Sequence, residues 1–489
     1  MRFALVGKVV SVLFVVGVLQ MVLWRIAFLV DERRARQVEA VQSVQQSLAS
    51  AQTLAGPMLQ RRCVEEWTQA VGSGKDRHDE TARREFTLQA TPQSLVVEGQ
   101  VKSEARYRGL FKVNGYDAQM VLDAGWDGLE SLRPARENKG SRLKCDAAVA
   151  VLAISDVRGV RNASLQINGV PVALRPGSQH GAYKHGLHAV LDDALVPAAD
   201  GSGSPAGALK LRLKLDLVGT AGLALVPAAA STQWQLRSDW PHPSFGGRFL
   251  PTTREVSEQG FSAQWALSGL ATSAPDDMRR GVPLCPADLA WGYGNPDAAA
   301  AAAAGNCLDT LSVTFFDPIN PYVLTDRAIK YGLLFIALTF VAVGLAELLA
   351  RGRVRRVHPV QYAMVGLALA LFFLLLLSLS EHLRFDLAYG LASGASVLLL
   401  ALYAGHMLGR LRDGLGFGAA LATLYGMLWV LLQREQTALV IGSVGLFTAL
   451  AAVMLLTRRL DWYAVGSNLQ RSINAPPAAN GAGAMGAAP

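Results

Sequence analysis

Three histidines and two aspartates lie close together in the first half of the chain, and side chains of these types can bind a metal ion. They are His180, His185, His188, Asp192 and Asp193. Their spacings of five and three residues do not match the four-residue spacing of the histidines in a zinc-binding HExxH helix. Glycines at 181 and 186 indicate a loop instead. We therefore expect a solvated loop here, with no metal site and no cofactor.

A second group has the residue types of a serine hydrolase. Asp239, His242 and Ser244 occur within the stretch SDWPHPSFGG. A hydrolase of the common α/β type would place its serine in a GxSxG turn, which is absent here, and Pro241 and Pro243 fix the backbone around the serine. Catalysis is not expected from this segment, and we predict that the chain is not an enzyme.

The same segment begins a long stretch rich in aromatic residues and arginine, from Trp240 to Trp265. One interpretation is a proline-stiffened segment whose aromatic side chains pack in a core. The other is an interaction surface, because exposed aromatic residues and arginine are enriched at interface hot spots. Both interpretations stay open for Trp240, Phe245, Arg248, Arg254, Phe261 and Trp265.

The four cysteines are Cys63, Cys145, Cys285 and Cys307. No CxxC pair occurs, which argues against a redox motif or a zinc knuckle. Four cysteines allow three disulfide connectivities, and an extracytoplasmic domain would permit any of them. We expect at least one disulfide and favour Cys285 with Cys307, because that bond would close off an insertion.

Long apolar stretches predict the membrane-spanning part. The chain is 51% hydrophobic and only 17% charged. A helix needs about 20 apolar residues to cross the bilayer. Six stretches meet that length: 9–30, 331–349, 360–379, 385–403, 415–432 and 438–456. The first continues past Arg25 with no prompt cleavage site, which favours an uncleaved anchor over a signal peptide.

The basic residues account for the orientation that we predict. Eleven lysines and arginines fall in the segments assigned to the cytosol, against Asp413 and Asp461, so the difference of about +9 explains the net charge of +8. Short basic loops beside apolar spans mark the cytosolic side. Both termini are therefore expected in the cytosol. No basic patch is left over, which argues against nucleic-acid binding.

The segment between the first two spans is predicted to be mainly β, after a helix from Asp31 to about Leu59. The alternation in LKLRLKLDLVGT (209–220) is typical of a half-buried strand. Asn168-Gly169 predicts a hairpin turn. We predict four parts: an anchor at 1–30, a periplasmic β domain at 31–328, five helices at 329–457 and a disordered cytosolic tail at 458–489. The Ala-rich stretch 298–304 is expected to be a surface loop.

Four stretches, in the same order, resemble the CreD family of bacterial inner-membrane proteins: DER (31–33), WPHPSFGGRFLPTTREVSEQGFSAQW (240–265), TDRAIKYGLLFIALTF (325–340) and HPVQYAMVGLALALFFLLLLSLSEH (358–382). The resemblance covers about residues 1 to 460. It implies an inner-membrane location, a periplasmic β domain, and a link to a two-component Cre system, envelope integrity and colicin tolerance. The family brings no catalytic residue or cofactor. The Ala-rich stretch, the tail and the crowded histidines depart from its pattern.

Two functions follow as alternatives. In the first, the β domain docks an envelope protein partner while the helices hold it in the lipid bilayer. In the second, the helices form a transporter or channel for an envelope component. Ionisable groups such as Lys330, Glu347, Glu381 and Asp386 lie near span ends and none lies at mid-span. That distribution argues against proton-coupled transport.

Overall fold

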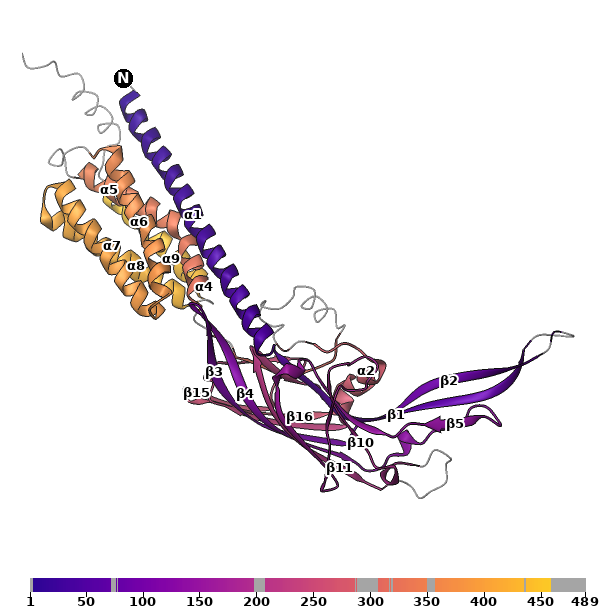
Figure 1. Cartoon of the computed structure of the whole chain (residues 1–489). Coiled ribbons are helices and arrows are strands. Elements are labelled where there is room, and N and C mark those ends of the chain that lie inside the picture. The colour runs from indigo at the N-terminus through magenta and orange to yellow at the C-terminus, as the bar shows by residue number, and fades with distance from the viewer. Residues whose placement is uncertain are drawn as a thin grey trace, which may run out of the picture. The chain divides into compact units, whose positions relative to one another are not determined.

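The computed structural model describes residues 3–71, 76, 78–197, 207–285, 287, 307–315, 317, 320–349, 357–434 and 437–458. The chain divides into two compact units, one of Met1–Arg34 with Ile319–Pro489 and one of Ala35–Pro318 (Figure 1). We call them the membrane unit and the β unit. The predicted Ala-rich loop, the cytosolic loop at 351–356 and almost all of the tail fall outside the described residues.

Helix α1 runs from Phe3 to Ser47 without a break. The prediction that it extends to about Leu59 is wrong, because strand β1 (Gln52–Val71) begins four residues after Leu48. Gly56 has a φ of +110° and Pro57 follows it, and neither suits the interior of a helix. Apolar residues at helical spacing therefore continue past the point where the backbone must change direction.

The β unit contains two sheets. Among the described residues the first has nine strands in the order β14-β17-β12-β1-β6-β10-β9, with β2 and β5 also paired to β1. The bounds besides β1 are β14 (Pro243–Gly247), β17 (Leu311–Phe315), β12 (Gly222–Leu225), β6 (Val149–Ile154), β10 (Gly186–Val190), β9 (Arg175–Pro176), β2 (His78–Ala90) and β5 (Arg142–Cys145).

The second sheet has eight strands in the order β15-β16-β13-β3-β4-β11-β7-β8, antiparallel except for β13 beside β3. The bounds are β15 (Thr253–Ser257), β16 (Gly260–Ser268), β13 (Ser231–Ser238), β3 (Ser94–Arg108), β4 (Phe111–Trp126), β11 (Leu209–Thr220), β7 (Val160–Ile167) and β8 (Val170–Val172). Short helices η2 (Glu130–Leu132), η3 (Val157–Gly159), η4 (Asp193–Leu195), η5 (Gly269–Ala271) and α2 (Ala274–Arg280) connect the strands.

One hydrophobic core lies between the two sheets and takes residues from both. Strand β11 confirms the predicted alternation, since its leucines from 209 to 217 are buried and Lys210, Arg212 and Lys214 are exposed. The β7–β8 hairpin turns at Asn168-Gly169, where both residues have positive φ. Period-two patterning therefore placed this part of the second sheet correctly.

All four cysteines form disulfides in the β unit. Cys63 bonds to Cys145, which lies directly opposite it on the antiparallel pair β1–β5. Cys285 bonds to Cys307. The first bond closes a loop of 82 residues and the second a loop of 22. Both bonds restrict the unfolded chain and so favour the folded one.

The membrane unit holds the N-terminal part of α1 and the helices α4 (Pro321–Lys330), α5 (Gly332–Leu349), α6 (Pro359–Ser380), α7 (Phe385–Leu408), α8 (Leu411–Gln433) and α9 (Ala438–Thr457). Five of the described helices are long and apolar enough to cross a membrane by themselves. Helices α4 and α5 meet at a bend of 45° and would make a sixth span only if counted together.

Helix α4 forms within the polar, proline-containing stretch that precedes the second apolar span. Asn320 caps the helix by accepting a hydrogen bond from the backbone N–H of Tyr322 at 3.0 Å, and Pro321 occupies the first turn. A polar cap followed by proline is a helix start signal. Polar residues are interspersed among the apolar ones after Pro321, so the sequence alone did not predict the start of this helix.

Replacing Leu213 by Ala should lower the free energy of unfolding by about 2–5 kcal/mol, because the side chain is buried in the core between the sheets. Lys214→Ala, at the next and exposed position, should change it by less than about 0.5 kcal/mol. Tryptophan fluorescence of the full-length protein in detergent, followed through denaturant unfolding, measures both. Equal effects of the two substitutions would contradict the described packing.

Candidate functional site

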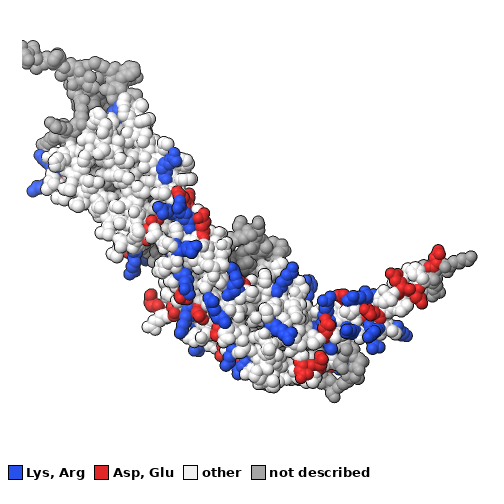
Figure 2. Space-filling model, in the orientation of Figure 1, with Lys and Arg blue, Asp and Glu red and all other residues white. Residues whose placement is uncertain are grey.

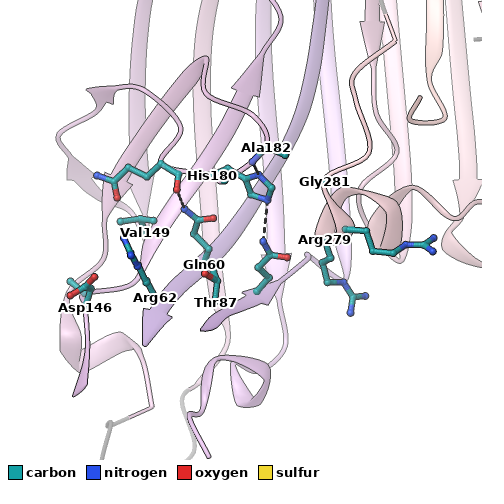
Figure 3. A pocket seen from close by; sticks show the side chains of 14 residues that line it. Gln60, Arg62, Thr87, Asp146, Val149, His180, Ala182, Arg279 and Gly281 are labelled. Atoms are coloured by element: carbon teal, nitrogen blue, oxygen red, sulfur yellow. Dashed lines mark hydrogen bonds between the residues drawn. The ribbon is translucent and has the colours of Figure 1, made fainter. Parts of the chain in front are cut away.

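The β unit contains a pocket of about 540 Å³ (Figure 3). Its walls come from five separate segments of the chain: β1, β2, the stretch from Asp146 to Val149, the loop 179–182 and the end of α2. The lining residues are Gln60, Arg62, Thr87, Gln89, Asp146, Ala147, Val149, Gln179, His180, Gly181, Ala182, Arg279, Arg280 and Gly281. Polar side chains predominate, so the pocket offers hydrogen bonds more than apolar contact.

His180 is the most buried titratable side chain of the lining. Its Nδ1 accepts hydrogen bonds from the backbone N–H groups of Ala182 and Tyr183, at 3.1 and 3.4 Å. Its Nε2 lies 3.0 Å from the amide of Gln89. Burial lowers the pKa of His180, so the ring is neutral at pH 7.

The amide of Gln60 completes this neutral wall by donating to the carbonyl oxygen of Gln179 at 2.8 Å. Charged residues lie around it. Arg62 forms an ion pair with Glu85, and Arg280 forms one with Asp277. Arg279 binds Asp276 at 2.7 Å. Figure 3 shows the side chain of Arg279 pointing away from His180. One wall of the pocket thus consists of neutral hydrogen-bonding groups, and the arginines around it are paired with carboxylates.

The expected histidine loop needs correction. His180 and His188 are buried and only His185 is exposed. His188 lies on β10, where its Nδ1 contacts the carbonyl oxygen of Gly177 at 2.6 Å and its Nε2 the amide of Gln179 at 2.8 Å. Each buried ring is therefore held by amide and backbone groups of its own. In the described part of the chain, no group of three metal-ligating side chains lies together.

Three of the predicted aromatic residues in the Trp240–Trp265 segment lie in the core. Trp240, Phe261 and Trp265 are buried, Phe245 is half-buried, and Arg248 and Arg254 are exposed. The Trp265 ring stacks on Trp234 at 4.4 Å between centroids, and its indole N–H donates to the carbonyl oxygen of Phe249. The aromatic residues therefore stabilise the two sheets. Of the six residues named for a possible interaction surface, only Arg248, Arg254 and part of Phe245 are accessible to a partner. The guanidinium of Arg254 lies over the ring of Phe245.

The hydrolase-like group is held apart by its own contacts. The Asp239 carboxylate accepts a hydrogen bond from the backbone N–H of Ser103 at 2.7 Å. The carbonyl oxygen of His242 accepts from the indole of Trp240 at 2.9 Å. These bonds fix the segment to β3 and to the core, which is a structural role.

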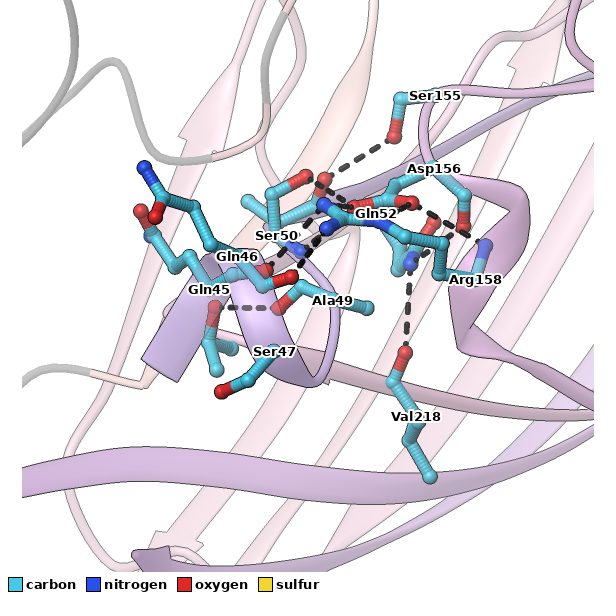
Figure 4. Close-up of polar contacts among 12 residues, drawn as sticks. Gln45, Gln46, Ser47, Ala49, Ser50, Gln52, Ser155, Asp156, Arg158 and Val218 are labelled. Atoms are coloured by element: carbon cyan, nitrogen blue, oxygen red, sulfur yellow. Dashed lines mark hydrogen bonds and ion pairs between the residues drawn. The ribbon is translucent and has the colours of Figure 1, made fainter. Parts of the chain in front are cut away.

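A polar network joins the end of α1 to the first sheet (Figure 4). The Asp156 carboxylate accepts hydrogen bonds from the backbone N–H of Ser50 at 3.0 Å and from the Nε of Arg158 at 2.9 Å. Arg158 also donates to the carbonyl oxygens of Gln45 and Gln46, two of the acceptors left unpaired at the end of a helix. We call Ser50, Asp156 and Arg158 the junction.

Sequence patterns did not indicate the pocket or the junction. Five segments up to about 220 residues apart supply the pocket, and each contributes common polar residues without a motif. At the junction, Asp156 and Arg158 follow the apolar strand β6, which is the one local signal. Such sites depend on pairing between distant strands, which a single sequence does not reveal.

Charged pairs in the membrane unit lie near the ends of its helices. Lys8 binds both oxygens of the Glu347 carboxylate at 2.7 Å. Arg33 lies 3.6 Å from Glu381. Lys330 pairs with Asp326 at 2.8 Å, one turn earlier on α4. The ionisable residues that the sequence placed at span ends are thus held in ion pairs.

Long apolar helices combined with a large, mainly β unit define a multi-pass membrane protein. A family model described as inner membrane protein CreD matches residues 4–463. The inner membrane protein CreD of Escherichia coli K12 is 31% identical over 467 residues, 95% of each chain. The chain belongs to the CreD family of inner membrane proteins.

Among solved structures, the chain is similar to the M1 zinc metallopeptidase of Deinococcus radiodurans, with 11% identity and a TM-score of 0.18 over 36% of this chain. A mutant of that enzyme gives 12% identity and a TM-score of 0.21 over 46% of this chain. The matches span 38% and 42% of those chains. At these TM-scores the likeness bears on neither fold nor function.

Replacing Asp156 by Asn should reduce stability at pH 7 by roughly 1–3 kcal/mol, because charge-assisted hydrogen bonds are lost. Burial alone would raise the pKa of Asp156, but the hydrogen bonds from Arg158 and Ser50 outweigh it and lower the pKa to about 2. The ordinary value is about 3.9. The stabilisation is therefore complete above about pH 5 and is lost progressively as the pH falls toward 2.

The difference in melting temperature between the wild-type protein and the Asp156→Asn variant should accordingly shrink between pH 5 and pH 2.5. Asp123→Asn is the control, since that carboxylate pairs with Arg212 on the exposed side of the second sheet. A gap between wild type and Asp156→Asn that stays constant over this range would show that the carboxylate is not the group that matters.

Proposed function

We propose that this protein is a non-catalytic inner-membrane protein that maintains the cell envelope by docking an envelope component in the pocket of its β unit. The pocket is the observation that carries the proposal. Its volume of about 540 Å³ falls within the range of ligand sites, about 300–1,000 Å³. Its position in the β unit agrees with the expectation that this unit, and not the helices, meets the partner.

The chemistry of the lining favours recognition over reaction. The His180 ring is neutral and both of its nitrogens have hydrogen-bond partners, so it is poorly placed as a general base. The amides of Gln60 and Gln89 and the hydroxyl of Thr87 are uncharged donors and acceptors. This combination suits the hydroxyl and amide groups of an envelope saccharide or peptide.

Membership of the CreD family supports the physiological part of the proposal. The family resemblance links such proteins to a two-component Cre regulon, to envelope stress and to colicin tolerance. We extend these properties to this chain as a proposal. In that role the amount of the protein would rise or fall with envelope stress, and that amount would determine how well the envelope resists damage.

For the topology we propose six spans, with both termini in the cytosol and residues 31–328 in the periplasm. Lys8 and Arg33 are 25 residues apart on one helix, about 38 Å of rise. The hydrocarbon core is about 30 Å thick. The Lys8–Glu347 and Arg33–Glu381 pairs can therefore lie at the two interfaces, with the apolar part of α1 between them.

The transporter alternative has no observation in its favour. Two hollows of the membrane unit are lined mainly by apolar side chains, one between α6 and α7 and one between α5, α8 and α9. Phe372 packs against Phe373, Tyr389 and Tyr425 inside the helices. Figure 2 shows a nearly uncharged surface over these helices. We therefore retain docking.

Deleting the protein and overproducing it should shift susceptibility to detergent and to colicins in opposite directions. In the deletion strain, a gene encoding Arg279→Ala with Arg280→Ala should restore resistance only in part, because these residues border the pocket. Arg212→Ala, which breaks a comparable exposed ion pair outside the pocket, should restore it fully. Susceptibility of the three complemented strains, at equal protein levels, is the measurement.

Full rescue by the pocket variant would remove the pocket from the proposal. No change in susceptibility in either the deletion strain or the overproducer would remove the envelope function itself.

The proposed orientation can be tested by labelling single introduced cysteines. Glu258→Cys lies in the exposed turn between β15 and β16, and Arg410→Cys lies between α7 and α8. A membrane-impermeant maleimide should label the first in intact spheroplasts and the second only after permeabilisation. The reverse pattern would place the β unit in the cytosol.

A further inference from the structure

The hairpin of β3 and β4 extends beyond the other strands of its sheet. Strand β13 pairs with β3 only as far as Val101, and β11 pairs with β4 only from Gly115 onward. From there to the turn, β3 and β4 pair only with each other, ending at Arg108 opposite Phe111. We call residues 105–114 the hairpin tip. A two-stranded ribbon is marginally stable in water unless something packs against it.

The hairpin tip is basic and apolar at once. It contains the sequence RYRGLFK, residues 106–112, with three basic and three large apolar or aromatic side chains and no acidic one. Tyr107 is 68% exposed and Leu110 is 54% exposed. Arginine and lysine together with tyrosine and leucine are the residue types found at the interface of a membrane.

Strand pairing places the basic groups on both faces of the ribbon. Tyr107 lies opposite Lys112 on one face, and Arg108 lies opposite Phe111 on the other. Gly109 has a φ of +60°, as required at the first position of a tight two-residue turn. That turn leaves Leu110 at the extreme end, with positive charge on either side of it.

The few acidic partners near the tip leave it basic. Arg106 pairs with Glu104 at 2.7 Å, and Lys112 binds Asp317 at 3.1 Å while lying over the ring of Trp240. In the described part of the chain, Arg108 has no ion pair. Arg108 is therefore the basic residue of the tip most available to an outside anion. Arg106 can also bind one, because its pair with Glu104 is exposed and such pairs are weak in water. Lys112 also serves the fold.

The hairpin tip contacts the end of the β unit, a few residues before helix α4 begins. The Asn114 amide donates to the carbonyl oxygen of Phe315 at 3.2 Å, and Lys112 holds Asp317. Asp317 precedes Asn320, the cap of helix α4, by only three residues. Three residues span at most about 11 Å. The chain itself thus keeps the tip within reach of the membrane surface.

We propose that the hairpin tip binds the surface of an anionic phospholipid bilayer. Leu110 and Tyr107 enter the headgroup region, and Arg106 and Arg108 bind lipid phosphates. The attraction is electrostatic at long range, so it requires anionic lipid and weakens with salt. The apolar contact of Leu110 and Tyr107 with the headgroup region determines how deeply the tip enters the bilayer. This proposal is independent of the pocket and of any envelope partner, and holds on whichever side of the membrane the β unit lies.

The test uses full-length protein in lipid nanodiscs with an environment-sensitive fluorophore on Leu110→Cys. The native cysteines are all in disulfides, so the new thiol is the single labelling site. Val170→Cys, 64% exposed in the β7–β8 hairpin, is the matched control. Discs contain either zwitterionic lipid alone or zwitterionic lipid with anionic phosphatidylglycerol, each with a trace of lipid carrying a nitroxide quencher on its headgroup.

We expect a blue shift and nitroxide quenching of the label at 110 in anionic discs, and neither for the label at 170. Both effects should fall at high salt and be lost with Arg106→Glu plus Arg108→Glu. They should persist with Arg106→Lys plus Arg108→Lys, because charge and not guanidinium geometry is used.

Three outcomes would overturn the proposal. A label at 110 that behaves like the one at 170 would leave the tip in water. A blue shift without quenching by lipid nitroxide would mean that protein covers the tip. Equal quenching in zwitterionic and anionic discs would mean that the covalent link of the β unit to helix α4 alone, without any attraction to anionic lipid, holds the tip at the membrane surface.

Discussion

The fold of the β unit depends on the backbone hydrogen bonds of a single strand. Strand β1 follows the anchor helix directly and has to find partners for both of its edges along twenty residues. Its first residues pair with β12 on one edge, and β6 takes the other. Farther along, β2 continues the edge begun by β12, and β5 continues the edge begun by β6. Every other strand of the first sheet attaches to this series.

The junction belongs to the same constraint. A helix that ends at Ser47 leaves carbonyl groups without a partner inside the helix, and the chain turns directly into the buried start of β1 at Gln52. Arg158 binds two of those carbonyls and Asp156 binds Arg158. The Gln52 amide, fully buried, donates to the carbonyl oxygens of Asp156 and Val218, which brings the second sheet into the same network. One polar cluster thus supplies hydrogen-bond partners to the backbone at the point where helix α1 ends and strand β1 begins.

The sequence predicts those features that a periodicity or a length determines. Bilayer thickness determines the apolar helices, and the two-residue period of a half-buried sheet determines β11 and its leucines. It does not determine where a continuing apolar pattern changes from helix to strand, as it does before Gln52. Nor does it decide whether an aromatic residue is exposed. Trp265 is buried because Trp234, on a strand thirty residues away, stacks on it.

The pocket and the burial of His180 were beyond prediction for a related reason. The ring of His180 is buried because the loop that carries it packs against Gln89 of β2, and the two positions are brought together only by the pairing of β1 with β2 and β6. The sequence suggested a solvated loop from its glycines, and those glycines do lie at 181 and 186 beside the buried ring. Composition alone did not distinguish a loop on the surface from one folded against a sheet.

The order in which β1 meets its partners has a consequence for biogenesis. Only β2 follows it closely, whereas β6, β12 and finally β17, which pairs with β12, come roughly 100, 170 and 260 residues later. The β unit therefore cannot close while it is being synthesised from its N-terminal end. Hairpins such as β3–β4 can pair early, but the first sheet is complete only after residue 315 has been synthesised, a few residues before helix α4 begins. Pairing between strands so far apart in the sequence is typical of domains that fold slowly.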